Sequence, residues 1–204
     1  MTDQNNDTKN KILEVARVLF ANQGFEGTSI REIAKEADVN IASVNYHFTN
    51  KENLFSEILN ASYLECSQEI KAFYEKENPK LEDILVHIFN YFTFKSHDLI
   101  TFFKMMMSTQ HNNKMVCQGP RSDERMGPPG GTVIEAAIEK EVGSAVSEMD
   151  KHWAVNCLFS HVFHISIMSK CWFKHNDLPF TSEEDIIRNI RRLSRVVLND
   201  LKTN

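Results

Sequence analysis

The sequence predicts an all-α protein of about nine helices, and two observations carry that prediction. Apolar residues recur at spacings of three and four in almost every segment, which is the period of an amphipathic helix. The strict alternation of apolar and polar residues that indicates a β-strand is nearly absent. The chain also has no internal repeat, so a repeat architecture is not expected.

The composition is that of an ordinary soluble globular protein. The 204 residues, 42% of them hydrophobic and 25% charged, are enough for one large domain or two small ones. The N-terminal residues are polar and no apolar run is long enough to cross a membrane, so we expect a cytoplasmic protein without a signal peptide. The formal net charge of −5 argues against a protein that coats nucleic acid by bulk attraction. Any DNA binding must therefore come from a few well-placed donors.

The cysteines do not form a recognisable framework. No CxxC pair and no dense spacing is found among the four cysteines, which are Cys66, Cys117, Cys157 and Cys171. They fit reduced thiols better than a set of disulfides.

The first helix is predicted to end at Gly24. Residues 1–7 are expected to form a disordered tail, with Asp7 or Thr8 capping the helix. Its apolar stripe consists of Ile12, Ala16, Leu19 and Phe20. Gly24 is placed to end the helix in the left-handed conformation that glycine favours.

Residues 28–51 predict two short helices joined by a tight turn. Thr28 or Ser29 can cap the first, and Glu32 stands at capping-box spacing from Ser29. A second helix is expected from near Ile41 to Phe48. Both helices are too short to be stable alone, so they must pack against neighbours. Two such helices form the helix-turn-helix unit, whose second member enters the major groove of DNA.

The second of these helices leaves most of its polar side chains exposed. Val44 and Phe48, four residues apart, can face the core. No residue from Val39 to Phe48 is acidic, although the chain as a whole is. Such a surface suits phosphates and base edges. On periodicity alone, the alternative is an ordinary polar surface helix.

Six further helices are predicted after this unit. They are expected at about residues 51–76, 81–95, 99–110, 132–142, 148–175 and 181–201. Thr132 is expected to cap the fourth of them, and Thr181 with Glu184 forms a capping box for the last. Residues 111–131 have no periodicity, and a connection of this length is usually functional or mobile.

The order of the N-terminal elements resembles the TetR-type repressor family. The matching residues are Ala21, Gly24, Phe25, Thr28, Ile33, Ala34, Val39, Val44, Tyr46, His47, Phe48, Lys51, Glu52, Leu54 and Phe55. They cover about the first 55 residues, and VNIASVNYHF looks like the branch similar to the CecR-type regulators. Asp38 stands where the family often has glycine, and Thr49–Asn50 stand where Pro–Ser is common. Neither departure removes a donor.

The resemblance implies a helical homodimer with two domains. Residues 1–50 would be the tail and helix-turn-helix DNA-binding domain, and residues 51–204 a ligand-binding and dimerisation domain. Carried over by position, the base-edge contacts are Ile41, Ala42 and Asn45. The phosphate contacts are Thr28, Ser43, Tyr46, His47 and Lys51. The Asn45 amide can pair with adenine through two hydrogen bonds, and Ala42 is small enough to sit against a thymine methyl.

A pocket for a small apolar or aromatic inducer is expected in the C-terminal half, where the family commonly binds its inducer. The candidate residues are Phe89, Phe92, Phe102, Phe103, Met106, Met107, Trp153 and Phe159. Flexible methionines adapt to varied ligands. The alternative is that these residues simply form core.

A dimer face is predicted on the two C-terminal helices. Its residues are Cys157, His161, His164, Met168, Cys171, Ile190, Leu193 and Val197. Four of them are soft ligands on one helical face and could bind Zn²⁺ or Cu⁺. A single helix rarely supplies a tetrahedral shell, so we expect no metal and no other cofactor. The arginines of the last helix, which follow three acids, predict a solvated face rather than a second DNA site.

The predicted function is that of a ligand-responsive regulator, a dimeric repressor released from a palindromic operator by a small molecule. An enzyme is the alternative from another class, but the chain has no G-x-S-x-G, no Gly-rich phosphate loop and no H-E-x-x-H. We therefore do not expect an enzyme. A redox- or metal-responsive version of the same regulator is a third possibility.

Overall fold

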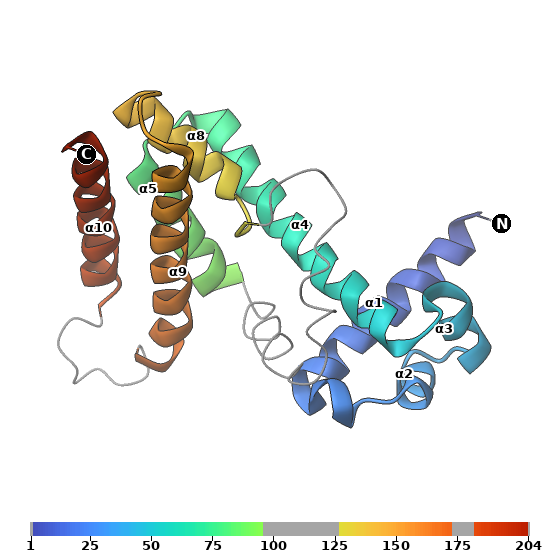
Figure 1. The fold of residues 1–204 in the computed structure, drawn as a ribbon. Helices are drawn as coiled ribbons and strands as arrows, with labels where there is room; N and C mark the ends of the chain where they lie inside the picture. The colour runs from blue at the N-terminus through green and yellow to red at the C-terminus, as the bar shows by residue number, and fades with distance from the viewer. Residues whose placement is uncertain (1, 96–126, 173–181, 204) are drawn as a thin grey trace. The chain divides into compact units, whose positions relative to one another are not determined.

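The computed structural model describes residues 2–95, 127–172 and 182–203, which fold into two compact units (Figure 1). Every regular element in these ranges is a helix, so the predicted all-α class is confirmed. The elements are α1 (Thr2–Gly27), α2 (Ile30–Glu36), α3 (Ile41–Phe48), α4 (Lys51–Glu77), α5 (Leu81–Asn90), the π-helix η1 (Tyr91–Lys95), α8 (Gly131–Val142), α9 (Glu148–Trp172) and α10 (Glu183–Thr203). The helix predicted at 99–110 and most of the connection at 111–131 lie outside the described residues.

The first unit contains α1, α2, α3 and the first turns of α4. Its core joins the apolar stripes of all four helices, and Phe20, Phe25 and Phe55 meet at its centre. The ring centroids of Phe20 and Phe55 lie 5.1 Å apart, as do those of Phe25 and Phe55. Ile33 of α2 and Val44 and Phe48 of α3 are buried in the same core, at about 1.5–3 kcal/mol each, which supports two helices that are too short to be stable alone.

Helix α1 is longer than the sequence predicts. It begins at Thr2, so the tail expected over residues 1–7 is instead an extension of the helix. No proline or glycine interrupts these residues, and an acid near a helix N-terminus is favoured by the helix dipole. Gly24 has φ 74° and ψ 173°, which interrupts the helical backbone where the sequence predicts a left-handed residue.

The boundary between the two units falls inside α4. The first unit ends at Tyr63 and the second begins at Leu64. Leu54, Phe55 and Ile58 of α4 belong to the core of the first unit. A division between residues 50 and 51 stays a prediction.

In the second unit, α5 is the central helix. It contacts α8, α9 and α10, and its buried residues are Leu81, Ile84, Leu85, Ile88 and Phe89. The later part of α4 packs against this group, because the rings of Phe73 and His87 stack with centroids 4.0 Å apart. Gly130, at φ 75°, lies so close to Ile70 that a Cβ atom there would come within 2.7 Å of its side chain.

Helices α8 and α9 are linked by a buried lysine. Lys151 of α9 is 7% exposed and forms ion pairs with Glu139 of α8 and with Glu148 one turn before it. A buried ammonium needs such partners, since an unpaired charge away from water is costly. The pair between Lys151 and Glu139 therefore joins α9 to α8.

The helix caps agree with the sequence at some ends and differ at others. Asn50 caps α4, its Oδ1 accepting from the Asn53 N–H at 2.8 Å, as predicted. The cap of α10 is Ser182 rather than Thr181, and its Oγ accepts from the Asp185 N–H at 3.1 Å. Helix α8 starts after Gly130 rather than after Thr132, because the left-handed Gly130 begins the turn two residues earlier.

None of the helices in the described ranges combines the length and the apolar character needed to cross a membrane.

Candidate nucleic-acid interface

The start of α2 is held by the cap that the sequence predicts. The Ser29 Oγ accepts from the Glu32 N–H at 3.2 Å. The other half of the capping box is replaced, because the Glu32 carboxylate accepts from the side-chain amide of Gln23 at 2.8 Å. Glu32 therefore links α2 to the end of α1.

The turn between α2 and α3 is closed by hydrogen bonds at both ends. The Val39 N–H donates to the Ala34 carbonyl at 2.9 Å, and Asp38 has φ 51°, in the region that favours glycine. The Asn40 Oδ1 then accepts from the Ala42 N–H at 2.9 Å and caps α3. The turn is therefore closed even though Asp38 stands where glycine is common.

Helix α3 divides into a buried side and an exposed side. Val44 and Phe48 are 0% and 1% exposed and anchor the helix in the core of the first unit, as predicted. Ala42 and Asn45 are exposed, Ser43 and His47 are half-buried, and Ile41 and Tyr46 are 41% and 76% exposed. The Tyr46 ring and hydroxyl therefore stand at the surface beside Ala42 and Asn45.

Helix α3 ends in a strained turn. Thr49 has φ 62° and ψ −48°, and the Asn50 N–H donates to the Phe48 carbonyl at 2.5 Å. This is the rare γ-turn of positive φ, which is especially unfavourable for a β-branched residue. The turn directs the chain from α3 into α4 within two residues.

Two of the residues predicted to contact phosphates have hydrogen-bond partners within the first unit, and their phosphate contacts stay a prediction. Thr28 is 1% exposed, and its hydroxyl donates to the Gly24 carbonyl at 2.9 Å. The Lys51 ammonium donates to the carbonyls of Phe25 and Thr28 at 2.9 and 3.1 Å and lies 4.2 Å from the centre of the Phe25 ring. In this structure both side chains hold the turn between α1 and α2, so they position the interface from within.

Two exposed cations on α2 were not among the predicted contacts. Arg31 and Lys35 are one turn apart and both are exposed. In a helix-turn-helix unit the first helix crosses the DNA backbone, so cations there suit phosphates. In the sequence, two cations four residues apart on the helix before the turn are the signal that could have identified them as phosphate contacts.

The predicted pocket residues separate into three groups. Phe89, Phe92 and Phe159 are buried in the second unit, and the Phe92 ring meets Phe159 and Phe163 at centroid distances of 6.0 and 5.7 Å. Trp153 is 48% exposed on α9. Phe102, Phe103, Met106 and Met107 lie outside the described residues. Phe163 completes the aromatic cluster and was missed, because its helix is apolar on more than one side.

Polar groups without partners lie on the same stretch of chain as Phe92. The Asn90 Oδ1 and the Thr93 Oγ1 are buried and have no hydrogen-bond partner among the residues that the structure describes. Asn90 ends α5 and Thr93 belongs to the π-helix η1, an irregular element that is frequent at functional sites. Buried polar atoms of this kind call for a partner, which the residues in the described ranges do not supply.

The predicted dimer face is only partly at the surface. His164 is exposed and Cys157, His161 and Met168 are half-buried on α9. On α10, Leu193 is half-buried, whereas Ile190 and Val197 are 0% and 5% exposed because they pack inside their own subunit. Those last two are therefore core residues, and the side chain of Cys171 lies outside the described residues.

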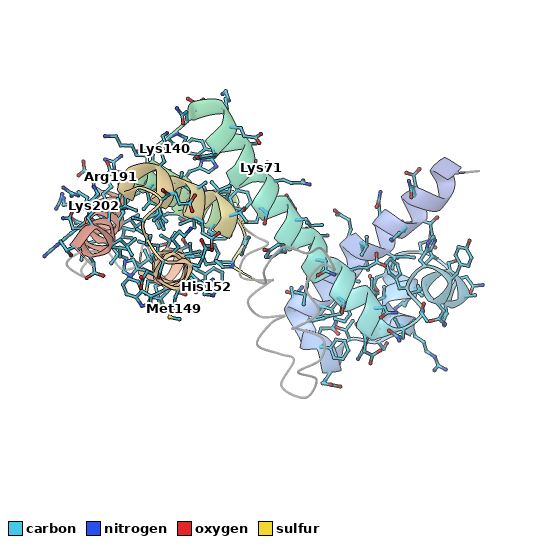
Figure 2. The ribbon with its side chains drawn as sticks, turned by 45° about the horizontal axis from the view of Figure 1, so that its top comes forward. Lys71, Lys140, Met149, His152, Arg191 and Lys202 are labelled. Carbon is cyan, nitrogen blue, oxygen red and sulfur yellow. The ribbon has the colours of Figure 1, made fainter. Side chains whose placement is uncertain are left out.

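A continuous exposed stripe on α9 lies beside the predicted face. Its residues repeat at spacings of three and four and are Met149, Trp153, Asn156, Ser160 and His164. Met149 is 80% exposed and, with His152, lies at the outside of the second unit (Figure 2). Within the described ranges, no three histidine, cysteine or acidic side chains gather closely enough to hold a metal ion.

Comparison with known proteins agrees with this architecture. Residues 12–58 match the family described as "Bacterial regulatory proteins, tetR family". The chain is 36% identical over 109 residues to the "Probable HTH-type transcriptional regulator YttP" of Bacillus subtilis (strain 168), covering 53% of this chain and 46% of that protein. It is 38% identical over 87 residues to the "HTH-type transcriptional regulator AcrR" of Shigella flexneri, covering 40% of each.

The chain thus spans less than half the length of these curated relatives. A crystal structure from Mesorhizobium loti MAFF303099, classed with the TetR family, matches the fold of nearly the whole chain. Its TM-score is 0.66 at 19% sequence identity, covering 96% of this chain and 97% of the other. The matched segment, residues 12–58, carries the capped helices and the turn described above, and this part of the chain is similar to the DNA-binding domain of TetR-family regulators.

Proposed function

We propose that this protein is a dimeric transcriptional repressor whose α3 enters the major groove of a palindromic operator and which a small apolar or aromatic molecule releases. One observation carries the DNA-binding part of the proposal. Helix α3 is anchored by Val44 and Phe48 and presents Ile41, Ala42, Asn45 and Tyr46 to solvent. Exposed amide, hydroxyl and methyl groups on a rigid helix are what base edges and phosphates require.

The ligand would bind in the second unit, near the aromatic cluster of Phe92, Phe159 and Phe163. Binding sites for small molecules are mostly apolar, with a few polar groups that fix orientation. The Asn90 Oδ1 and the Thr93 Oγ1 are candidates for those polar groups, because the described chain leaves both without a partner. A ligand with a hydrogen-bond donor and an aromatic or aliphatic body would satisfy this environment.

The dimer would form through the exposed stripe of α9. Met149 and Trp153 supply apolar area that a partner would cover, and a two-fold axis would bring the stripe against its own copy. A two-fold dimer reads a palindrome, so the spacing between the two copies of α3 selects the spacing of the half-sites. A ligand that favours a different spacing would lower the affinity for DNA, and DNA would lower the affinity for the ligand by the same factor.

The experiment is a binding titration of the purified full chain against its own upstream DNA and against scrambled DNA of equal length. We expect specific binding that weakens steeply with added salt, because phosphate contacts release counterions. The double variant Asn45→Ala/Tyr46→Ala should lose specific binding and keep its thermal stability, since both side chains are exposed.

The matched control is Gln68→Ala, which removes an exposed amide from α4 in the second unit. It should bind operator DNA as the unaltered protein does. If a selection from genomic fragments recovers no sequence that the unaltered protein prefers, the proposed function is wrong.

A further inference from the structure

Helix α3 and the turns that flank it contain no lysine or arginine. From Asn40 to Asn50 the only residue that can carry a positive charge is His47, which is half-buried. The next lysine in the sequence, Lys51, already donates to the carbonyls of Phe25 and Thr28, and Lys9, whose ammonium lies 5.6 Å from the centre of the Phe48 ring, pairs with Glu57. Guanine is most often read by arginine or lysine, whose donors reach its O6 and N7 atoms together. The helix therefore lacks the usual means of reading guanine.

The exposed side chains of α3 suit the other base pair. The Asn45 side chain is exposed and makes no hydrogen bond within the described residues, so its amide is free to donate to adenine N7 and accept from adenine N6. Ile41 is 41% exposed and Ala42 is exposed in the first turn of the same helix. Their methyl groups can pack against the 5-methyl group of thymine.

The position of these groups is fixed by the core and by the cap. Asn45 follows the fully buried Val44, and Ala42 donates its own N–H to the Asn40 Oδ1 at 2.9 Å. Rigid placement matters because a two-bond amide contact requires defined geometry. The Asn40 Oδ1 is already engaged in the cap, which makes Asn45 the better-placed amide for a base.

We propose that α3 reads its half-site through adenine–thymine pairs, with Asn45 on adenine and Ile41 and Ala42 on thymine methyl groups, and makes no arginine- or lysine-type contact with guanine. The inference rests on the proposed function, since it requires that α3 enters the major groove. It goes further by assigning a base chemistry to the operator: a half-site whose directly contacted positions are adenine and thymine.

The test uses operator duplexes selected by the full-length protein from random DNA, with single atoms then removed. Replacing thymidine by deoxyuridine removes only the 5-methyl group, and replacing adenine by 7-deazaadenine removes only the N7 acceptor. 7-Deazaguanine, placed at each guanine of the half-site in turn, is the matched control. We expect 7-deazaadenine at one position to weaken binding about fivefold to a hundredfold. Deoxyuridine at adjacent positions should weaken it by about threefold per methyl group.

Protein variants then show which side chain contacts each DNA atom. In Asn45→Ala the penalty for 7-deazaadenine should disappear, because the amide that reads N7 is gone. In Ile41→Ala the penalty for deoxyuridine should shrink while the penalty for 7-deazaadenine stays. Gln68→Ala, with an exposed amide elsewhere, should keep both penalties.

The outcomes separate this inference from the proposed function. A selected operator in which 7-deazaguanine costs as much as 7-deazaadenine, or whose penalties are unchanged in Asn45→Ala, overturns the inference and leaves a DNA-binding regulator in place. Failure to select any preferred duplex overturns both.

Discussion

Thr49 is a single residue on which the geometry of the DNA-binding unit depends. It has φ 62° and ψ −48° and stands at the centre of the γ-turn between α3 and α4. Strained backbone persists only where the surrounding structure holds it, and here Phe48 on one side and Leu54 on the other are buried in the core.

Replacing Thr49 by glycine should raise the stability of the protein. Glycine adopts positive φ without the clash of a β-branched side chain, so Thr49→Gly should add about 1 kcal/mol to the free energy of unfolding. Urea titration of the full chain measures it. Ala61→Gly, at an exposed position inside α4, is the control and should lower stability by about 1 kcal/mol. Equal loss in the two variants would show that the Thr49 turn carries no strain.

Lys51 gives a second prediction at this scale, because the structure and the sequence assign it different roles. Lys51→Met removes two hydrogen bonds from a charged donor and should cost about 2 kcal/mol of unfolding free energy, with operator binding lost as the turn loosens. Arg31→Met, on the exposed side of α2, should weaken binding without a change in stability. If Lys51 contacts a phosphate instead, its variant will behave as Arg31→Met does.

At the scale of elements, the helices could be predicted better than their partners. Periodicity and caps locate α2, α3, α4, α5 and α9 to within a few residues, because apolar spacing and side-chain oxygens act locally. The spacing that puts Val44 and Phe48 on one face also predicts correctly that both are buried. These properties need no knowledge of the rest of the fold.

What the sequence could not predict depends on three-dimensional neighbours. Thr28 and Lys51 are polar residues that flank the predicted helix-turn-helix, and their donors reach carbonyls that the fold brings near. Ile190 and Val197 lie on an apolar stripe that periodicity cannot assign to a core or to a dimer. That the Asn90 Oδ1 and the Thr93 Oγ1 are buried without a partner among the described residues follows from packing, which periodicity does not give.

Helix α9 should make the stability of the second unit sensitive to acid. Burial, and to a lesser extent the nearby His164, lowers the pKa of His161 below its ordinary value of 6.5. The unfolded chain therefore takes up this proton first as pH falls, so His161 contributes stability above pH 6.5 that is lost progressively below it.

Thermal unfolding between pH 8 and pH 5 tests this contribution. His161→Gln should flatten the fall in melting temperature below pH 6.5, and the exposed His152→Gln should leave it unchanged. Carboxylates add their own acid dependence, which is common to all three proteins and cancels in the comparison. A His161→Gln curve parallel to that of the unaltered protein contradicts the prediction.

At the scale of the whole molecule, we propose that tight binding to DNA requires a dimer, because the chain as a whole is acidic. With a formal charge of −5 and few placed donors on each α3, we expect one copy to have little affinity for DNA and two copies on one palindrome to gain from effective concentration. Trp153→Glu puts a charge in the exposed stripe of α9 and should yield monomers in sedimentation experiments, with operator affinity lowered about a hundredfold or more. Lys71→Glu, exposed on α4, is the charge control and should stay dimeric.

One variant of Asn90 should change both the stability of the protein and its release from DNA by a ligand. If its Oδ1 is kept without a partner in order to receive a ligand, Asn90→Leu should raise the unfolding free energy of the ligand-free protein by about 1 kcal/mol, since leucine has a similar shape and no acceptor. The same change should leave operator affinity intact and abolish release by any compound that frees the unaltered protein from DNA. The compounds come from a thermal-shift screen of small aromatic donors, and release is read by fluorescence anisotropy of labelled operator.

Val86→Leu, at a half-buried position of α5, is the control for repacking and should keep the response. A variant that is less stable, or that still releases DNA with the same compound, places the ligand elsewhere and makes Asn90 an ordinary structural residue.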